Sequence, residues 1–383
     1  MATIGPADSP VPGQPQPDGG AEVAEDPGLE PPYLDLEALE ARSRELLPQP
    51  TYDYYAGGAE TETTMREATA AWRSWRLRPR VLRGVTEASL ATELLGAAVG
   101  TPIGIAPWAY QAMAHPDGEL ATARAAAASG ALMTVSTSAN NSLEEVAEAA
   151  PGSPRWFQLY RLHSDRHTED LARRAGDAGY QALVLTVDVP VLGRRRRDMG
   201  HDFVHRAGVR MANRPPEGEE PTLDGLATGT WTFDAIARFG EVSGLPVVVK
   251  GILRGDDAVR CVQAGAAAVW VTTHGGRQAD PCVASAHALP EVVDAVGDDA
   301  EVYADGGIRS GSDVLTALAL GASAVFLGRP IAWGLTTGGE RGVAGVIDGL
   351  TAELAHAMVL CGLPDVRALP RDTVTPAGVI RRT

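Results

Sequence analysis

The chain has 383 residues, 44% of them apolar and 21% charged, which is typical of a globular protein large enough for one big α/β domain. Its formal net charge of -16 argues against nucleic-acid and anionic-membrane partners, because such a surface repels phosphate groups. We find no signal peptide and no apolar run of roughly 18 residues that would cross a membrane. The 3 scattered cysteines, without a CxxC pair, predict neither a disulfide framework nor a metal site, so we expect a cytoplasmic protein.

The first part of the chain is irregular. Residues 1–32 are rich in Pro, Gly, Ala, Asp and Glu and lack Lys and Arg, which predicts a disordered acidic tail. Residues 34–47 place their leucines near one face, as in an amphipathic helix. The stretch YDYYAGGAETETT that follows predicts two short helices separated by a Gly-Gly break.

From residue 102 onward, short apolar or β-branched runs alternate with Ala-rich helical stretches. We predict eight strands, at residues 102–107, 132–137, 155–160, 182–188, 246–251, 268–274, 301–307 and 324–330. Eight such βα units predict a (β/α)8 TIM barrel, and residues 33–383 are expected to form a single domain around it. An open doubly wound sheet is disfavoured because no GxGxxG follows the first strand. The polar interruption at residues 193–230 lies where barrel enzymes place lids.

Polar residues gather where the predicted strands end, and the chemistry of a TIM barrel lies at the carboxyl ends of its strands. In chain order these residues are Ser136 and Thr137, Gln158 and Tyr160, Thr186 and Asp188, Lys250, His274 with Arg277, Asp305 to Gly307 with Arg309, and Gly328 with Arg329. Any one of them alone is more often a helix cap or a satisfied polar group. A His, an Asp, a Lys, a Tyr and an Arg around one mouth predict a catalytic site.

Two further features predict a phosphorylated cofactor. The segments DGGIRSG and LGRP follow the seventh and eighth strands, where barrels commonly bind phosphate through backbone N–H groups. Arg309 and Arg329 could pair with that phosphate in a bidentate manner. Lys250 is the single lysine of the chain, and it could place a compact positive charge beside an electron-accepting ring.

The chain resembles the FMN-dependent 2-hydroxy-acid oxidase and dehydrogenase family, which includes glycolate oxidase, lactate oxidase and mandelate dehydrogenase. The resemblance spans about residues 34–369. It is carried by the ordered set YDYYAGGAETETT, RLRPRVLR, GIAPWAYQAMAHPDGE, FQLY, LTVDVPVLGRR, VVVKG, THGGRQAD, DGGIRSGSDVLTALALGA and FLGRP. The resemblance implies oxidation of an (S)-2-hydroxy acid to the 2-keto acid by bound FMN, with O2 as the simplest electron acceptor and H2O2 as the product. It also implies a homotetramer or homo-octamer.

The resemblance implies a role for each site residue. His274 is the expected base, with Asp188 stabilising the imidazolium. Arg277 and Tyr54 would bind the substrate carboxylate, Tyr160 would contact the hydroxyl or keto oxygen, and Arg195 would assist. Lys250 would lie beside the flavin ring. The other expected flavin contacts are Pro107, Trp108, Ala109, Ser136, Gln158 and Thr186 at the ring and Asp305, Gly306, Gly307, Arg309, Gly328 and Arg329 at the phosphate.

Three residues depart from the pattern of the family. Trp108 replaces a small or hydroxylated residue beside the flavin and is expected to contact the substrate, Ser138 replaces a tryptophan of glycolate oxidase, and Thr273 replaces an asparagine. The changed pocket suggests an acid larger than glycolate, either aromatic or of medium chain length. Three alternatives stay open at this point: a dehydrogenase that reduces a quinone or cytochrome, a monooxygenase, and an FMN enzyme acting on a larger biosynthetic intermediate.

Overall fold

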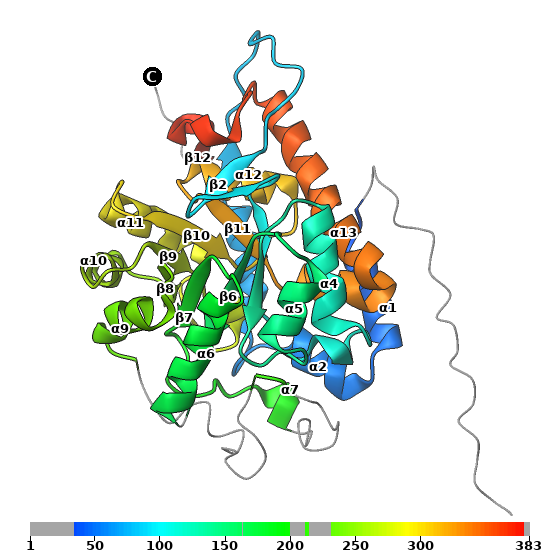
Figure 1. Ribbon diagram of the computed structural model, residues 1–383. Coiled ribbons are helices and arrows are strands. Elements are labelled where there is room, and N and C mark those ends of the chain that lie inside the picture. Colours follow the sequence, from blue (N-terminus) through cyan, green and yellow to red (C-terminus); the bar gives the residue numbers. More distant parts are fainter. Residues whose placement is uncertain (1–33, 163, 200–210, 214–230, 379–383) are drawn as a thin grey trace, which may run out of the picture.

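Eight short parallel strands close into a barrel, with helices packed around it (Figure 1). The computed structural model describes residues 34–162, 164–199, 211–213 and 231–378. The expectation for residues 1–32 and most of the expectation for residues 193–230 lie outside the described residues. The strands are β4 (Ile103–Ile105), β5 (Met133–Ser136), β6 (Arg155–Leu159), β7 (Ala182–Thr186), β8 (Val247–Ile252), β9 (Ala268–Val271), β10 (Glu301–Asp305) and β11 (Ala324–Leu327).

The strand order β10-β11-β4-β5-β6-β7-β8-β9 follows the chain around the closed ring, so the predicted TIM barrel is confirmed. Each observed strand lies within a predicted segment, except that β8 runs one residue further, to Ile252. The prediction was too long at several carboxyl ends, because residues such as His274 leave the ladder and bend into the mouth of the barrel.

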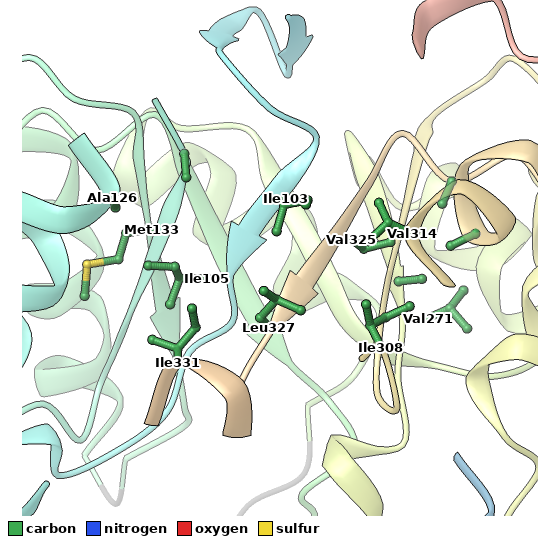
Figure 2. Packing of buried hydrophobic residues seen from close by; sticks show 14 of the residues in the cluster. Ile103, Ile105, Ala126, Met133, Val271, Ile308, Val314, Val325, Leu327 and Ile331 are labelled. Carbon is green, nitrogen blue, oxygen red and sulfur yellow. The ribbon is translucent and has the colours of Figure 1, made fainter. Parts of the chain in front are cut away.

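The helices between the strands form the outer layer. They are α4 (Gly118–Ala128), α5 (Leu143–Ala149), α6 (Asp165–Asp177), α9 (Asp234–Ser243), α10 (Gly255–Gln263), α11 (Ser285–Val296), α12 (Gly311–Ala319) and α13 (Arg329–Leu360). Serine caps three of them, as Ser142, Ser164 and Ser310 each accept a hydrogen bond from a backbone N–H of the first turn. Figure 2 shows part of the apolar layer beneath these helices, including Ile103 and Ile105 of β4.

The N-terminal helices cover the barrel from outside. They are α1 (Leu36–Leu46), α2 (Gln49–Ala56) and α3 (Thr63–Trp72), and the Gly-Gly break lies between the last two, as predicted. Two small antiparallel sheets were not predicted: β1 (Trp75–Leu77) with β12 (Val374–Pro376), and the hairpin of β2 (Thr92–Leu94) and β3 (Ala97–Val99). Leu94 and Val99 of the hairpin pack with side chains of the barrel interior.

The helix α13 corrects one expectation. It is long and apolar enough, by length and composition, to cross a membrane, and the sequence analysis did not recognise it. Gly338 and Gly339 have non-helical backbone angles, so the helix is broken in two. Its buried side chains pack against α1, α4 and α12, which accounts for part of its apolar composition.

The interior of the barrel is filled by aromatic rings. The ring centroids of Trp270 and Phe326 are 4.0 Å apart, and those of Trp156 and Tyr303 are 5.1 Å apart. Gly104 of β4 makes room for them, since a Cβ atom at this position would lie 2.5 Å from the Phe326 ring. This layer is a solid floor, and the polar residues of the next layer stand above it.

The substitution Gly104→Ala should therefore destabilise the protein by about 1–3 kcal/mol, because the added methyl group overpacks the aromatic layer. Urea unfolding of the two proteins measures this difference. Gly100→Ala is the matched control, since its Cβ would meet only ordinary contacts at 3.6–3.8 Å. Equal losses in both variants would contradict the packing argument.

Candidate active site at the barrel mouth

A cavity of about 390 Å³ opens at the carboxyl ends of the strands. Its size falls in the range of small-molecule and cofactor pockets, roughly 300–1,000 Å³. Most of the predicted site residues line it: Tyr54, Pro107, Trp108, Ala109, Ser136, Tyr160, Arg195, Lys250, His274, Arg277, Asp305, Gly306, Gly307, Arg309, Gly328 and Arg329. Thus residues that are up to 275 positions apart in the sequence meet at one place, as the strand-end argument predicted.

Three predicted site residues do not line the cavity. Gln158 and Thr186 lie below it, where Gln158 Nε2 donates to Thr186 Oγ1 at 3.0 Å and Ser136 Oγ donates to Gln158 Oε1 at 3.3 Å. Ser136, which bonds to Gln158, does line the cavity. Asp188 lies behind His274 and acts on the cavity only through it.

His274 is held between an acid and a phenol. Its Nδ1 lies 3.0 Å from Asp188 Oδ1, and its Nε2 lies 3.3 Å from the Tyr160 hydroxyl. The backbone of His274 has φ 55°, a left-handed conformation that is uncommon for a side chain of this size. Its N–H donates to Thr272 Oγ1 at 2.9 Å, which helps to hold this turn. The ring is therefore fixed with one nitrogen on Asp188 and the other towards Tyr160 and the cavity.

A bulge in β8 lets Asp188 approach. The β8–β9 register shifts between Lys250 and Ile252, and Gly251 has φ 126°. A Cβ atom on Gly251 would lie 2.8 Å from Asp188, so only glycine fits here.

The charges of the pair follow from its surroundings. Burial lowers the pKa of His274, and Lys250 lowers it further, while Asp188 acts in the opposite direction. Burial acts to raise the pKa of Asp188, but His274 and Lys250 outweigh it and lower that pKa. The resting pair at neutral pH is therefore a neutral imidazole beside a carboxylate, which is the form that can accept a proton.

Two half-buried arginines of the cavity wall donate to carbonyl oxygens at the end of α2. Arg277 Nη1 donates to the carbonyl oxygens of Tyr54 and Gly57, the latter at 2.8 Å. Arg329 donates to the carbonyls of Tyr55 at 3.1 Å, Gly275 at 2.9 Å and Gly57 at 2.9 Å. Burial lowers the pKa of Arg277 to about 10 and that of Arg329 to about 9. No carboxylate among the described residues forms an ion pair with either of them, and backbone carbonyl oxygens accept their hydrogen bonds instead.

Lys250 stands on the floor of the cavity. Its Nζ lies 3.7 Å from Asp305 Oδ2 and 5.5 Å from the centroid of the Trp270 ring. The Thr272 hydroxyl donates to the other oxygen of Asp305. The single lysine of the chain is thus buried, and Asp305 and Trp270 fix the position of its ammonium group.

The glycines after β10 and β11 have different tasks. Gly306 and Gly307 have φ 92° and 84°, and a Cβ on Gly307 would lie 2.4 Å from the backbone of Ala68 in α3. Position 307 therefore requires glycine, both for its left-handed backbone conformation and for its close contact with α3. A Cβ on Gly328 would meet nothing within 4 Å, because this residue borders the open cavity at the start of α13. The first backbone N–H groups of a helix have no partner within that helix and attract anions.

A model of the FMN-dependent dehydrogenase family matches residues 43–376 of the chain. The chain belongs to this family. An L-lactate oxidase from Nostoc sp. is 47% identical over 345 residues, which cover 86% of this chain and 94% of the relative. A 4-hydroxymandelate oxidase from Amycolatopsis orientalis is 42% identical over 358 residues, which cover 91% and 99% of the two chains. A crystal structure of mandelate oxidase superposes with a TM-score of 0.84 at 42% identity, covering 90% of this chain and 98% of the other.

The predicted family, the FMN cofactor and the oxidation of a 2-hydroxy acid are thereby confirmed as the class of the protein. The described residues fit FMN. Gly328 leaves open space beside Arg329 and Arg309, where a phosphate dianion would find two guanidinium groups and a helix start. Arg309 is half-buried and forms no ion pair with a carboxylate among the described residues, and desolvation lowers its pKa. The roles of the individual residues stay predictions.

Residues that the sequence analysis missed complete the wall of the cavity. The ring of Tyr110 lies 5.7 Å from that of Tyr54, and the ring of Tyr55 lies 5.4 Å from that of Trp108. The Tyr55 hydroxyl donates to the Tyr110 carbonyl at 2.6 Å. Tyr55 adjoins a predicted site residue in the YDYY string, but nothing in the sequence distinguishes Tyr110 from an ordinary loop residue.

The cavity border at Gly328 yields a test of the cofactor site. Gly328→Ala should weaken FMN binding by roughly tenfold or more, because the methyl group enters the space where the cofactor fits. It should leave the stability of the FMN-free protein unchanged, since φ is -108° and nothing is displaced. FMN titration followed by flavin fluorescence, with thermal unfolding of the apoprotein, measures both. Unchanged FMN affinity would place the cofactor elsewhere.

The His274–Asp188 pair yields a pH prediction. A base whose pKa is lowered by burial stays unprotonated at neutral pH, so kcat/KM should be flat there and fall only as the pH drops below about 6.5. Asp188→Asn removes the group that raises this pKa and stabilises the charged ring. The acid limb should then move to lower pH, and the plateau should fall by roughly 10²–10⁴-fold. An acid limb that keeps its position in Asp188→Asn would show that another group titrates.

Proposed function

We propose that the chain oxidises an (S)-2-hydroxy acid to the 2-keto acid and passes the electrons to O2, with H2O2 as the second product. The observation that carries this proposal is the arrangement of His274 between Asp188 and Tyr160 in a cavity that Arg277 also lines. In one cavity, His274 supplies a base, Tyr160 a hydrogen-bond donor for the substrate oxygen, and Arg277 a binding group for the substrate carboxylate.

The chain's own residues divide the work. Arg277 is oriented by the Tyr54 and Gly57 carbonyls, and its guanidinium lies over the Tyr54 ring with 4.9 Å to the centroid. A guanidinium fork in this position suits a substrate carboxylate. Burial raises the pKa of Tyr160, so its hydroxyl stays protonated and can donate to the substrate oxygen. His274 Nε2 then takes a substrate proton, and Asp188 balances the charge that develops on the ring.

FMN, when bound, supplies the two-electron acceptor for this oxidation. Lys250, on the floor of the cavity, would place positive charge beside the flavin ring, and Arg309, Arg329 and Gly328 would hold the phosphate.

We propose further that the acid carries an aromatic or medium-length apolar side chain. Four aromatic rings in mutual contact line one side of the cavity: those of Tyr54, Tyr55, Trp108 and Tyr110. Val189 and Leu192 also line the cavity, and so does Ser138, whose side chain is small. An aromatic substituent against such rings gains about 0.5–1.5 kcal/mol beyond its burial. Glycolate and lactate cannot use this surface.

The decisive experiment is an anaerobic visible spectrum of the purified protein, before and after addition of a panel of (S)-2-hydroxy acids. The panel should include glycolate, lactate, 2-hydroxyoctanoate and mandelate. We expect a flavin spectrum that mandelate or 2-hydroxyoctanoate bleaches fastest and that recovers quickly when air is admitted. Trp108→Thr should reduce the preference for these acids over lactate, and Ser138→Trp should reduce it further by filling the space.

The other outcomes decide between the remaining readings. Bleaching with slow recovery in air would favour a dehydrogenase, and a decarboxylated product with no free H2O2 would favour a monooxygenase. A flavin that no small acid bleaches would indicate a larger substrate. Faster bleaching by glycolate or lactate would contradict the proposed substrate size. The cytoplasmic location and the tetrameric or octameric state stay predictions.

A further inference from the structure

The carboxylate of Asp280 binds a distant part of the chain. Its Oδ1 accepts from Thr64 N at 2.7 Å and Thr64 Oγ1 at 2.8 Å. Its Oδ2 accepts from Thr61 N at 3.1 Å, Thr61 Oγ1 at 2.8 Å and Thr63 N at 3.3 Å. In return, Cys282 N donates to Thr64 Oγ1 at 2.9 Å. Five hydrogen bonds to one carboxylate thus join the α2–α3 segment to the loop after β9, and bonds to an ionised group are stronger than neutral ones.

These bonds replace a cap that α3 lacks locally. Glu62 occupies the N-cap position with φ 59° and makes no side-chain cap hydrogen bond. Its carboxylate instead accepts from Gly58 N at 3.0 Å and pairs with Arg197 at 2.6 Å. Two of the free N–H groups of the first turn of α3, those of Thr63 and Thr64, are therefore satisfied by Asp280, more than 200 residues away in the sequence.

The link lies between the two halves of the substrate site. The α2–α3 segment carries Tyr54, whereas the loop that ends at Asp280 carries His274 and Arg277. The two segments touch closely, since Ala59 N donates to the Gly276 carbonyl at 2.8 Å and a Cβ on Gly276 would lie 2.7 Å from Met65 N. Arg277 also donates to the Tyr54 and Gly57 carbonyls at the other end of this segment, so a displacement of α3 would reach the Tyr54 and Arg277 side chains through the chain between Gly57 and Thr61.

The same loop is fixed on its other side by Gln278. Its Nε2 donates to the carbonyls of Asp188 and Val191, both at 2.9 Å, and its Oε1 accepts from Gly193 N at 3.0 Å. Gln278 therefore aligns the loop with Asp188, and Asp280 aligns it with the N-terminal helices.

We propose that Asp280 is a positioning residue, which holds Tyr54 in register with Arg277 so that one substrate carboxylate meets both. This inference rests on the proposed function. The carboxylate is ionised throughout the working range: burial acts to raise the pKa of Asp280, but the hydrogen bonds from Thr64, Thr61 and Thr63 hold it well below its usual range. The five hydrogen bonds to the Asp280 carboxylate therefore persist across this pH range and do not act as a pH switch.

The test uses the FMN-loaded enzyme with Asp280→Asn and Asp280→Ala. Asparagine keeps one acceptor oxygen, so we expect a graded effect. KM for the substrate acid should rise roughly 10-fold for Asn and towards 100-fold for Ala, with a smaller change in kcat. Thr64→Val is a milder variant, because it keeps the Asp280 carboxylate and the Thr64 backbone donor and loses only the hydroxyl. It keeps the proposal testable if the two Asp280 variants fail to fold. Its KM should rise less.

Asp35→Ala, compared with Asp280→Ala, is the control for lost helix capping. Asp35 also caps a helix with its carboxylate, through Ala38 N at 2.9 Å, but α1 contributes no residue to the cavity. It should lose about 0.5–2 kcal/mol of stability and keep KM unchanged. A rise of KM in Asp35→Ala in proportion to its loss of stability would overturn the proposal, because the effect would then follow from general destabilisation.

A double-mutant cycle with Tyr54→Phe separates positioning from a structural role. If Asp280 acts through Tyr54, the effects of Asp280→Ala and Tyr54→Phe on KM should be strongly non-additive. Additive effects would overturn the proposal. Amide hydrogen exchange of residues 54–64, measured without substrate, should rise in Asp280→Ala and not in Asp35→Ala. If no 2-hydroxy acid bleaches the wild-type flavin, the proposed function fails and this inference fails with it. A bleached wild type with additive variants overturns the inference alone.

Discussion

The structure depends on positive charge that is gathered, buried or half-buried, at one end of the barrel. Lys250, Arg277, Arg309 and Arg329 all line a single cavity, and only Lys250 has a carboxylate partner among the described residues, at 3.7 Å. Such charge is costly to bury without compensation. Carbonyl oxygens of Tyr54, Tyr55, Gly57 and Gly275 offset part of the cost for Arg277 and Arg329. The part of the desolvation cost that these carbonyls do not offset favours the binding of anions. A flavin phosphate and a substrate carboxylate would supply such anions. Cofactor and substrate are thus linked to the stability of the fold itself.

The same carbonyls explain why the site needs the N-terminal helices. The strands alone would present His274, Lys250 and the glycine loops on an open surface. The α2–α3 segment closes the mouth, and its helix end supplies the acceptors that the arginines require. Trp72 adds a further attachment, as its Nε1 donates to the Gly306 carbonyl at 2.7 Å. The barrel therefore provides the reacting groups, and the N-terminal segment provides the enclosure that makes their charges effective.

The sequence was informative where local chemistry decides the structure. The eight strands follow from β-branched and apolar runs, and the cavity follows from polar residues that end those runs, so Lys250, Asp305 and Arg329 could be assigned to one site. Partners that lie far apart in the chain could not be predicted. The Asp280 carboxylate satisfies three threonines that carry no pattern of their own, Arg329 donates to backbone carbonyls that look alike in any sequence, and β1 pairs with the distant β12. Even the role of Gly251 becomes visible only when Asp188 is seen 2.8 Å from its missing Cβ.

The bulge at Gly251 finally connects the fold to the chemistry. It brings Asp188 to His274 while Lys250 stays on the floor, so the imidazole lies between a negative and a positive charge. The resting ring is neutral, because burial and Lys250 both disfavour its charged form. Asp188 Oδ2 is buried and has no hydrogen-bond partner among the described residues, so that carboxylate is incompletely satisfied before the reaction. Protonation of His274 would complete an ion pair that the resting site lacks. The stabilising interaction between the Asp188 carboxylate and a charged His274 ring therefore forms only when the substrate loses its proton. Stabilisation that appears at this step, and not before it, accelerates the reaction.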